Sequence, residues 1–287
     1  MHSDAHEQVD AALYVVATPL GNLRDITLRA LDVLAAVDAV AAEDTRVTRR
    51  LMSHYGLRTP LVALHQHNEA RAAAEIVRRI QAGEAIAYVT DAGTPGISDP
   101  GAVLVARVRA AGLRVVPVPG PSAVSAALSA AGVSDPHFLF YGFLPAKASA
   151  RRDALAALAS LPYRLVFFEA PQRVGQSLAD MAQVLGPERE VVIARELTKV
   201  FESFHSCALA DAPRWLSEDP NRLRGEFVLI VEGAAQAPVH AQDAGEHALE
   251  VLLRELPLKQ SVQLAAQISG ARRNALYARA LELKRDR

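Results

Sequence analysis

The segment AIAYVTDAGTPGISDPG, residues 85–101, joins an apolar run to a turn rich in glycine, proline and aspartate. Glycine reaches backbone angles closed to other residues, and proline fixes its own φ and has no amide proton. The turn therefore displays its main chain in a rigid conformation. An ordinary connection between a strand and a helix needs about two to six residues. Because this one is longer and carries Asp91 and Asp99, we favour a ligand-binding loop over a plain connection.

Further apolar runs alternate with helix-length spacers on both sides of this segment. They are LYVVATP, AVAAED, LVALH and RVVPVP. This alternation is typical of parallel strands joined by right-handed crossover helices, in a sheet buried on both faces. We therefore expect an N-terminal α/β domain over residues 12–133, in which the loops that leave the C-terminal ends of the strands line a ligand crevice.

The alternation of apolar runs and helix-length spacers ends at the turn-rich stretch SAAGVSDPHF, residues 129–138. The later runs AREL and VFESF are separated only by the dipeptide TK, which indicates a hairpin. We expect a second α/β domain with a mixed sheet over residues 134–236. A linker containing Pro238 then leads to a small helical domain, residues 240–287, which resembles a helix-turn-helix with Gly270 at its turn. The expected fold class is α/β, with two α/β domains and C-terminal helices.

Composition narrows the class of protein. The chain has 287 residues, and 51% of them are hydrophobic. No apolar run approaches the roughly eighteen residues of a membrane span, and the first residues lack a signal-peptide pattern, so we expect a cytoplasmic protein without a membrane partner. The lone Cys207 excludes an internal disulfide and a cysteine-based metal cluster. His65 and His67 share one side of a strand but have no third ligand at a suitable spacing, so no metal is expected.

The charge of the chain is uneven. Residues 257–287 hold seven Lys or Arg and two Asp or Glu, a net charge of +5; since the whole chain carries −1, residues 1–256 carry −6. A basic tail on an acidic body suggests a partner that carries phosphate, although a solvated or packed helix face would have the same composition. Taken alone, the helix-turn-helix pattern with Arg272 and Arg273 would suggest a DNA-binding regulator.

Two common nucleotide motifs are missing. After the first strand the chain offers only Gly21 where a dinucleotide fold needs G-x-G-x-x-G, and no P-loop occurs. The loops instead supply carboxylates, hydroxyls and exposed main chain. These groups suit a polar, partly cationic ligand with ribose hydroxyls and an amino group.

Several long motifs together resemble one family. They are, in order, LYVVATPLGNLRDITLRALDVLAAVDAVAAEDTR, HQHNE, VTDAGTPGISDPG, VPGPSAVSAALSAAG, YGFLPAK, ARELTK, RGEFVLIVEG and the tail LPLKQSVQLAAQISGARRNALYARAL. The chain resembles the ribosomal RNA small subunit methyltransferase I family, which are 16S rRNA cytidine 2'-O-methyltransferases of the tetrapyrrole methylase superfamily. The resemblance implies S-adenosyl-L-methionine bound between two α/β domains, a homodimer, and methylation of the ribose 2'-hydroxyl of a decoding-centre cytidine. It implies 16S rRNA of the small ribosomal subunit as partner, and not DNA.

The resemblance also implies a set of cofactor-binding residues. They are Pro19, Leu20, Asp91, Gly93, Thr94, Pro95, Ile97, Ser122, Ala123, Phe168, Gly225 and Glu226. The chain departs from the family pattern at Ala170 and Gln172, where relatives often have Ser and His, and at Phe201, where they often have His. Proton transfer by these three positions is therefore not expected.

The candidate catalytic residues are bases or groups that orient the ribose hydroxyl. They are Lys199, Glu196, Asp99, Glu43 and Asp44. A dedicated base is not obligatory, because positioning alone supplies much of the rate. Lys199 has an alternative role as a phosphate anchor, and Asp44 has an alternative role as a helix N-cap with Arg46 beside it. Two other functions stay open: methylation of a tetrapyrrole, and a helix-turn-helix regulator with a metabolite-sensing body.

Overall fold

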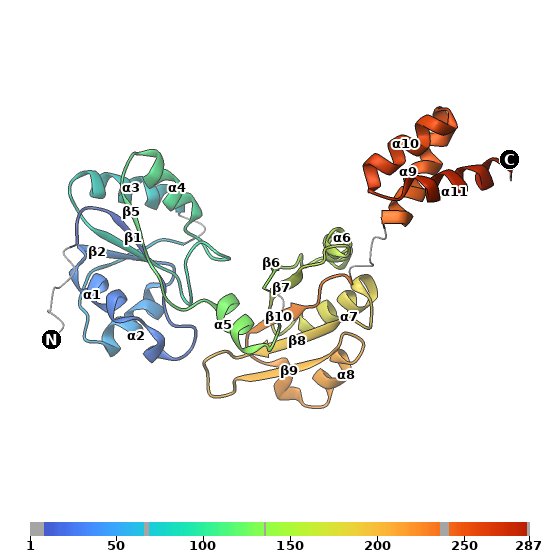
Figure 1. Cartoon of the computed structure of the whole chain (residues 1–287). Coiled ribbons are helices and arrows are strands. Elements are labelled where there is room, and N and C mark those ends of the chain that lie inside the picture. The colour runs from blue at the N-terminus through green and yellow to red at the C-terminus, as the bar shows by residue number, and fades with distance from the viewer. Residues whose placement is uncertain (1–8, 66–68, 135, 236–240, 286–287) are drawn as a thin grey trace, which may run out of the picture. The chain divides into compact units, whose positions relative to one another are not determined.

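The computed structural model describes residues 9–65, 69–134, 136–235 and 241–285. The chain forms two compact units, residues 1–233 and 234–287, and the first of them contains two five-stranded sheets (Figure 1). The α/β fold class is thereby confirmed, while a division of the first unit at residue 133 stays a prediction. His67 and Pro238 lie outside the described residues.

The first sheet is entirely parallel, with strand order β3-β2-β4-β1-β5. Its strands are β1 (Leu13–Val16), β2 (Ala39–Ala42), β3 (Leu61–Ala63), β4 (Ile86–Val89) and β5 (Val115–Val118). Every residue of β2 and β4 is buried, which agrees with the continuous apolar runs that predicted strands covered on both faces.

Helices cover both faces of this sheet, as Figure 1 shows. The covering helices are α1 (Leu28–Ala36), α2 (Thr45–His54), α3 (Glu69–Gln81) and α4 (Ala102–Ala110); this part of the chain also contains a 3-10 turn, η1, at Leu23–Asp25, and the helix α5 (Ala123–Ala130). Alternate strand residues pack against α1 and α2 on one face and against α3 and α4 on the other. Helix α5 instead packs against the second sheet.

The loops at the C-terminal ends of β1 and β4 are joined to each other. The backbones of Thr18 and Gly93 exchange two hydrogen bonds, of 2.9 and 3.0 Å. The buried Thr18 hydroxyl also donates to the Thr90 carbonyl at 3.0 Å. Thr18 therefore holds the glycine-rich loop against the loop that follows β1.

The far end of the glycine-rich loop is held by a carboxylate. Glu69, the first residue of α3, accepts backbone hydrogen bonds from Gly101, Val103 and Leu104 at 2.9, 3.1 and 3.3 Å. These amides belong to the first turn of α4, which has no side-chain cap of its own. Glu69 therefore satisfies them from outside the helix.

The second sheet is mixed, as expected, with strand order β6-β7-β10-β8-β9. Only β6 and β7 pair in parallel within it. Its elements are β6 (Phe138–Phe143), α6 (Ala148–Leu158), β7 (Arg164–Glu169), α7 (Val174–Leu185), β8 (Glu190–Arg195), β9 (Ser203–Ala208), α8 (Ala212–Ser217), the 3-10 turn η2 (Pro220–Leu223) and β10 (Phe227–Val231). Helices α6, α7 and α8 cover one face of this sheet, and α5 packs on the other.

The hairpin between β8 and β9 has a longer connection than the sequence suggested. The strand ends at Arg195 and the connection spans residues 196–202, instead of the dipeptide TK. The reason is the backbone of Glu196 and Thr198, which have φ of 53° and 66°. A left-handed conformation is incompatible with a strand, so the chain leaves the sheet earlier.

The C-terminal unit is a bundle of α9 (Ala241–Glu255), α10 (Leu258–Ser269) and α11 (Arg273–Arg285) around its own apolar core. Gly270 ends α10 with φ of 71°, the left-handed conformation that glycine adopts at a helix C-terminus. The expected helix-turn-helix pattern, with Gly270 at the turn, is confirmed. Among the described residues, no helix is both long and apolar enough to cross a membrane.

Candidate functional site

A pocket of about 430 Å³ lies against the glycine-rich loop, and we call it the central pocket. It continues into a small hollow of about 40 Å³ with which it shares Leu20, Ala92, Asp99, Ala123 and Phe168. A volume of this size falls within the range of small-ligand sites, about 300–1,000 Å³.

The central pocket takes its walls from several elements of the first unit. The loops after β1 and β4 supply Leu20 and Asp99, and α5 supplies Ala123 at its N-terminus. Strands β7 and β10 of the second sheet supply Phe168 and Val228. Carboxylates and aromatic rings thus face one space, which gives both a polar and an apolar lining.

Three carboxylates beside the loops share one electrostatic property. Partial burial raises the pKa of Glu43, Asp91 and Asp99 above their ordinary values, and repulsion from neighbouring carboxylates adds to the effect. Asp91 and its neighbours are also linked, since Asp91 Oδ1 accepts from the Asp44 amide at 3.1 Å and the Asp91 amide donates to Glu43 Oε2 at 3.4 Å. A cationic ligand would relieve this repulsion.

Asp44 has a structural role in the same network. It is the N-cap of α2 and accepts a hydrogen bond from the Arg46 amide at 2.8 Å. The Arg46 guanidinium lies 2.6 Å from Asp44 Oδ2. Hydrogen bonds from the Arg46 side chain and backbone lower the pKa of Asp44 to about 2. The N-cap interpretation of Asp44 is confirmed, and this carboxylate stays ionised.

Lys199 lies between two carboxylates on the connection from β8 to β9. Its Nζ is 2.8 Å from Glu196 Oε1 and 2.9 Å from Glu226 Oε2. Although burial opposes protonation, these hydrogen bonds raise the pKa of Lys199 above its ordinary value. The same contacts lower the pKa of Glu196 despite the opposing effect of burial. Lys199 is therefore a cation at neutral pH, which suits an anchor rather than a base.

Glycines permit this arrangement. A Cβ atom on Gly225 would lie 2.5 Å from the Glu196 side chain, and Gly225 has φ of 95°. A Cβ on Gly21 would lie 2.3 Å from Lys199 Cγ. The loop that contains Lys199 therefore packs closely on the loop after β1, and the Asn22 amide donates to Thr198 Oγ1 at 3.1 Å.

The structure brings most of the expected cofactor residues together. The cofactor residues that line the central pocket or its small extension are Leu20, Gly93, Thr94, Ile97, Ser122, Ala123, Phe168 and Glu226, and the catalytic candidate Asp99 lines both. Pro19 and Asp91 line a different pocket, and Gly225 lines a third one beside α7. Neither the central pocket nor its extension is lined by the cofactor residue Pro95 or by the catalytic candidates Glu43, Asp44, Glu196 and Lys199. The functional roles of all these residues stay predictions.

Other residues of the central pocket were not expected as binding residues. They include Ala92, Phe143, Leu197, Phe227 and Val228, together with the departures Ala170 and Gln172. Phe143 and Val228 belong to apolar strands, where nothing in the sequence separates a pocket residue from a core residue. The polar segment EAPQRV after β7 is the only sequence signal that marks this wall.

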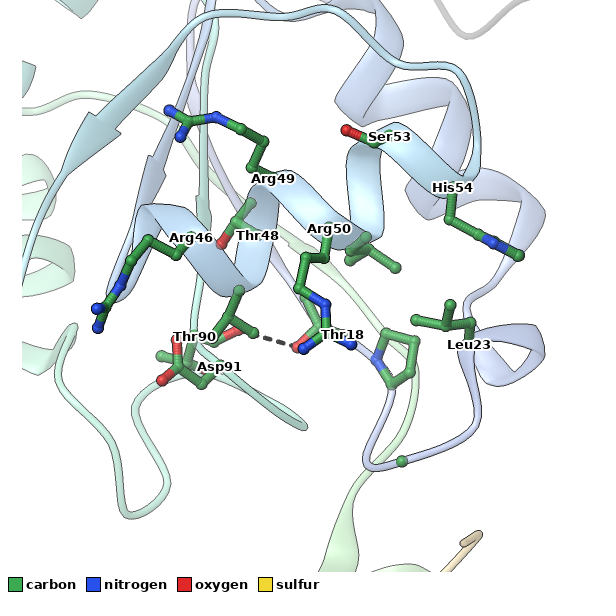
Figure 2. Close-up of a pocket in the computed structure, with 14 residues that line it drawn as sticks. Thr18, Leu23, Arg46, Thr48, Arg49, Arg50, Ser53, His54, Thr90 and Asp91 are labelled. Atoms are coloured by element: carbon green, nitrogen blue, oxygen red, sulfur yellow. Dashed lines mark hydrogen bonds between the residues drawn. The ribbon is translucent and has the colours of Figure 1, made fainter. Parts of the chain in front are cut away.

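A larger pocket of about 960 Å³ lies beside α2, and we call it the α2 pocket (Figure 2). Thr18, Pro19, Thr90 and Asp91 contribute to its lining, so it uses the same two loops as the site already described. Its remaining lining comes largely from α2, including three arginines and a histidine. The segment TRVTRR, with three arginines in five residues, was the sequence signal for this pocket, and it was missed.

We expect Asp99→Asn to stabilise the ligand-free protein at neutral pH. Because burial raises the pKa of Asp99, folding penalises its charged form. Wild type carries this penalty in full above the raised pKa and loses it as the pH falls from there to the ordinary pKa. The variant carries no such charge, so its free energy of unfolding should exceed that of wild type at pH 8. The two should converge as the pH falls toward about 3.9, the ordinary pKa of Asp. Urea unfolding at both pH values measures the difference, and an equal difference at both would contradict the assignment.

Comparison with known proteins first defines the class. Residues 12–213 match the family model of Tetrapyrrole (Corrin/Porphyrin) Methylases. The fold matches a solved uroporphyrin-III-C-methyltransferase from Thermus thermophilus, with TM-score 0.55, 19% identity, and coverage of 77% of this chain and 94% of that one. A second structure of that Thermus enzyme, complexed with S-adenyl homocysteine, matches with TM-score 0.55, 17% identity, and coverage of 77% and 97%. The family match and the fold are those of a tetrapyrrole methylase.

Relatives with much higher sequence identity define the family more narrowly than the solved structures do. The ribosomal RNA small subunit methyltransferase I of Pseudomonas aeruginosa is 53% identical, covering 94% of this chain and 96% of that protein. The protein of the same name from Escherichia coli O157:H7 is 50% identical, covering 96% and 98%. Residues 239–284 match the RsmI C-terminal HTH domain. The chain belongs to the ribosomal RNA small subunit methyltransferase I family.

Proposed function

We propose that the chain transfers a methyl group from S-adenosyl-L-methionine to the ribose 2'-hydroxyl of a decoding-centre cytidine in 16S rRNA. The observation that carries the proposal is the near-full-length identity, about half of all positions, to proteins named for methylation of small-subunit ribosomal RNA. The central pocket adds a site of suitable size and chemistry.

The residues of the central pocket fit this cofactor. Burial raises the pKa of Asp99, one of the carboxylates in its lining, and a sulfonium or an ammonium group nearby would stabilise the charged form of that carboxylate. Gly93 turns with φ of 78° and leaves its backbone open to a ligand. Leu20 and Phe168 supply an apolar surface for a purine ring. When bound, the cofactor supplies an electrophilic methyl group.

The chain's own residues position the reactants. Asp99, half-buried with a raised pKa, is suited to accept the proton that leaves the ribose hydroxyl. Lys199, held as a cation between Glu196 and Glu226, is suited to fix a phosphate of the substrate. Alignment of hydroxyl and methyl in the pocket supplies most of the barrier reduction.

The substrate is the small ribosomal subunit or its rRNA. In the C-terminal unit, Lys259, Arg272 and Arg273 are exposed, and we assign them supporting phosphate contacts. The protein acts in the cytoplasm as a homodimer, without membrane or DNA partners; two-fold dimers are the commonest soluble assembly. Analytical ultracentrifugation at micromolar concentration tests the dimer.

The reaction is tested with labelled cofactor and 30S subunits from a strain that lacks the enzyme. Digestion to nucleosides should place the label on 2'-O-methylcytidine. Label on a base would refute the 2'-hydroxyl as acceptor. A tetrapyrrole offered in parallel is the control for the family's other substrates, and label on it alone would refute the RNA assignment.

A further inference from the structure

The α2 pocket carries a group of cations that the proposed chemistry leaves without a role. Asp91 is the one acidic residue in its lining. A neighbouring hollow of about 230 Å³ shares Arg49 and Ser53 with it and adds Arg58. Figure 2 shows Arg50 directed toward Thr18, whereas Arg49 leaves the helix on the opposite side. The basic lining residues of the α2 pocket are Arg46, Arg49, Arg50 and His54.

The amphipathic pattern of α2 places these cations outward. Thr48, Leu51 and Met52 are the buried residues of the helix, so the positions between them face solvent. Arg46 and His54 are eight residues apart, which corresponds to about 12 Å along the helix axis. The arginines and His54 thus span a distance suited to an extended ligand.

Two of these arginines are not neutralised within the protein. Arg46 is paired with Asp44 at 2.6 Å. Arg49 and Arg50 are exposed, and in the described part of the chain they form no salt bridge or hydrogen bond. Residues 1–256 carry −6 overall, so both arginines are cations on an acidic body. Two neighbouring unpaired arginines on an acidic body therefore suggest a ligand that carries negative charge.

The position of the pocket connects it to the reaction. Pro19 lines the α2 pocket and the next residue, Leu20, lines the central pocket. In the same way, Asp91 lines the α2 pocket and Ala92 lines the central pocket. A chain bound along α2 would therefore pass beside the site of methyl transfer. The helix N-terminus is already capped by Asp44, so an anion would be bound by side chains.

We propose that the α2 pocket binds the sugar–phosphate backbone of the single-stranded RNA segment that carries the target ribose, with Arg49 and Arg50 contacting phosphates. Planar guanidinium groups bind phosphate in a bidentate manner. Phosphate contacts fix the register of a nucleic acid without reading its sequence. A single strand is required because a ribose in a continuous helix does not enter a pocket. This inference rests on the proposed function and adds the path of the substrate.

The test uses the double variant Arg49→Gln/Arg50→Gln. A fluorescein-labelled single-stranded RNA oligonucleotide is titrated by anisotropy over a range of salt concentrations. Loss of two phosphate contacts should weaken binding roughly tenfold and reduce the slope of log K against log salt by about 1.4. With 30S subunits, KM should rise while kcat stays close to wild type. Calorimetry should show unchanged affinity for S-adenosyl-L-methionine.

The matched control is Arg71→Gln/Arg109→Gln, which removes the same charge. Both residues are exposed, on α3 and α4, which cover the opposite face of the first sheet. This control should keep the wild-type slope. An unchanged slope in the α2 variant, or an equal loss in the control, would overturn the proposal. So would conversion of a wild-type dimer to monomers by the α2 variant alone, because the face would then be a contact between copies. RNA binding is measured without turnover, so failure of the proposed reaction would show separately in the nucleoside product.

Discussion

Gly93→Val should weaken binding of S-adenosyl-L-methionine by roughly a hundredfold, which is about 2.7 kcal/mol. Gly93 has φ of 78°, a conformation that costs a β-branched residue of order 1–3 kcal/mol. A Cβ there would lie 3.3 Å from Leu20 Cδ2, and the two γ-methyl groups of valine would displace that side chain from the pocket wall. Isothermal titration calorimetry measures the loss.

Gly96→Val is the matched control in the same loop. Gly96 has the same φ, 78°, but a Cβ there meets nothing within 4 Å. Both variants should lose similar stability to backbone strain, whereas Gly96→Val should lose less than about tenfold in affinity. Wild-type affinity in Gly93→Val, or equal losses in both variants, would show that the cofactor does not depend on this part of the loop.

Lys199→Ala should lower kcat by about a hundredfold while affinity for S-adenosyl-L-methionine changes less than about threefold. The lysine bridges Glu196 and Glu226 and packs against Gly21, so its removal loosens the connection from β8 to β9 where it packs on the loop after β1. Misplacement of reacting groups by about 1 Å costs about 10²-fold in rate. Single-turnover kinetics with 30S subunits measures the effect.

Two further substitutions separate charge from packing. Lys199→Arg keeps the cation and should retain most of the activity, whereas Lys199→Met keeps the chain length and should resemble Lys199→Ala. Because its pKa is raised, Lys199 stays protonated throughout the acidic range and is not the group whose protonation lowers the rate there. The acidic limb of the pH–rate profile should therefore be the same in wild type and Lys199→Arg. A parallel loss of cofactor affinity and kcat in Lys199→Ala would place the lysine in cofactor binding instead.

The first sheet was predictable because its signals are local. Apolar runs such as β4 are followed by turns of glycine and proline, and the buried pattern of each run is that of a strand covered on both faces. The connection after Arg195 was not predictable in the same way. Its left-handed residues are Glu196 and Thr198 rather than glycines, so their conformation depends on contacts with Lys199, Glu202 and the loop after β1.

The candidate site was predictable only in part, for the same reason. The composition of the glycine-rich loop predicts a ligand-binding role, and Gly93 of this loop lines the pocket extension. Phe143 and Val228 line the pocket because tertiary packing brings β6 and β10 to it. Nothing in the local sequence of these apolar strands distinguishes a pocket residue from a core residue. The arginines of α2 are visible in the sequence, but their pocket exists only because the loop containing Pro19 lies opposite them.

Two backbone hydrogen bonds between Thr18 and Gly93 join the loop after β1 to the loop after β4, and this bridge lies beside both pockets. Thr18 lines the α2 pocket and Gly93 lines the extension of the central pocket, so movement of either residue is transmitted to the other. With cofactor in one pocket and RNA along the other, the two affinities are thermodynamically linked. Whatever factor the cofactor gains in affinity from bound RNA, RNA gains from bound cofactor.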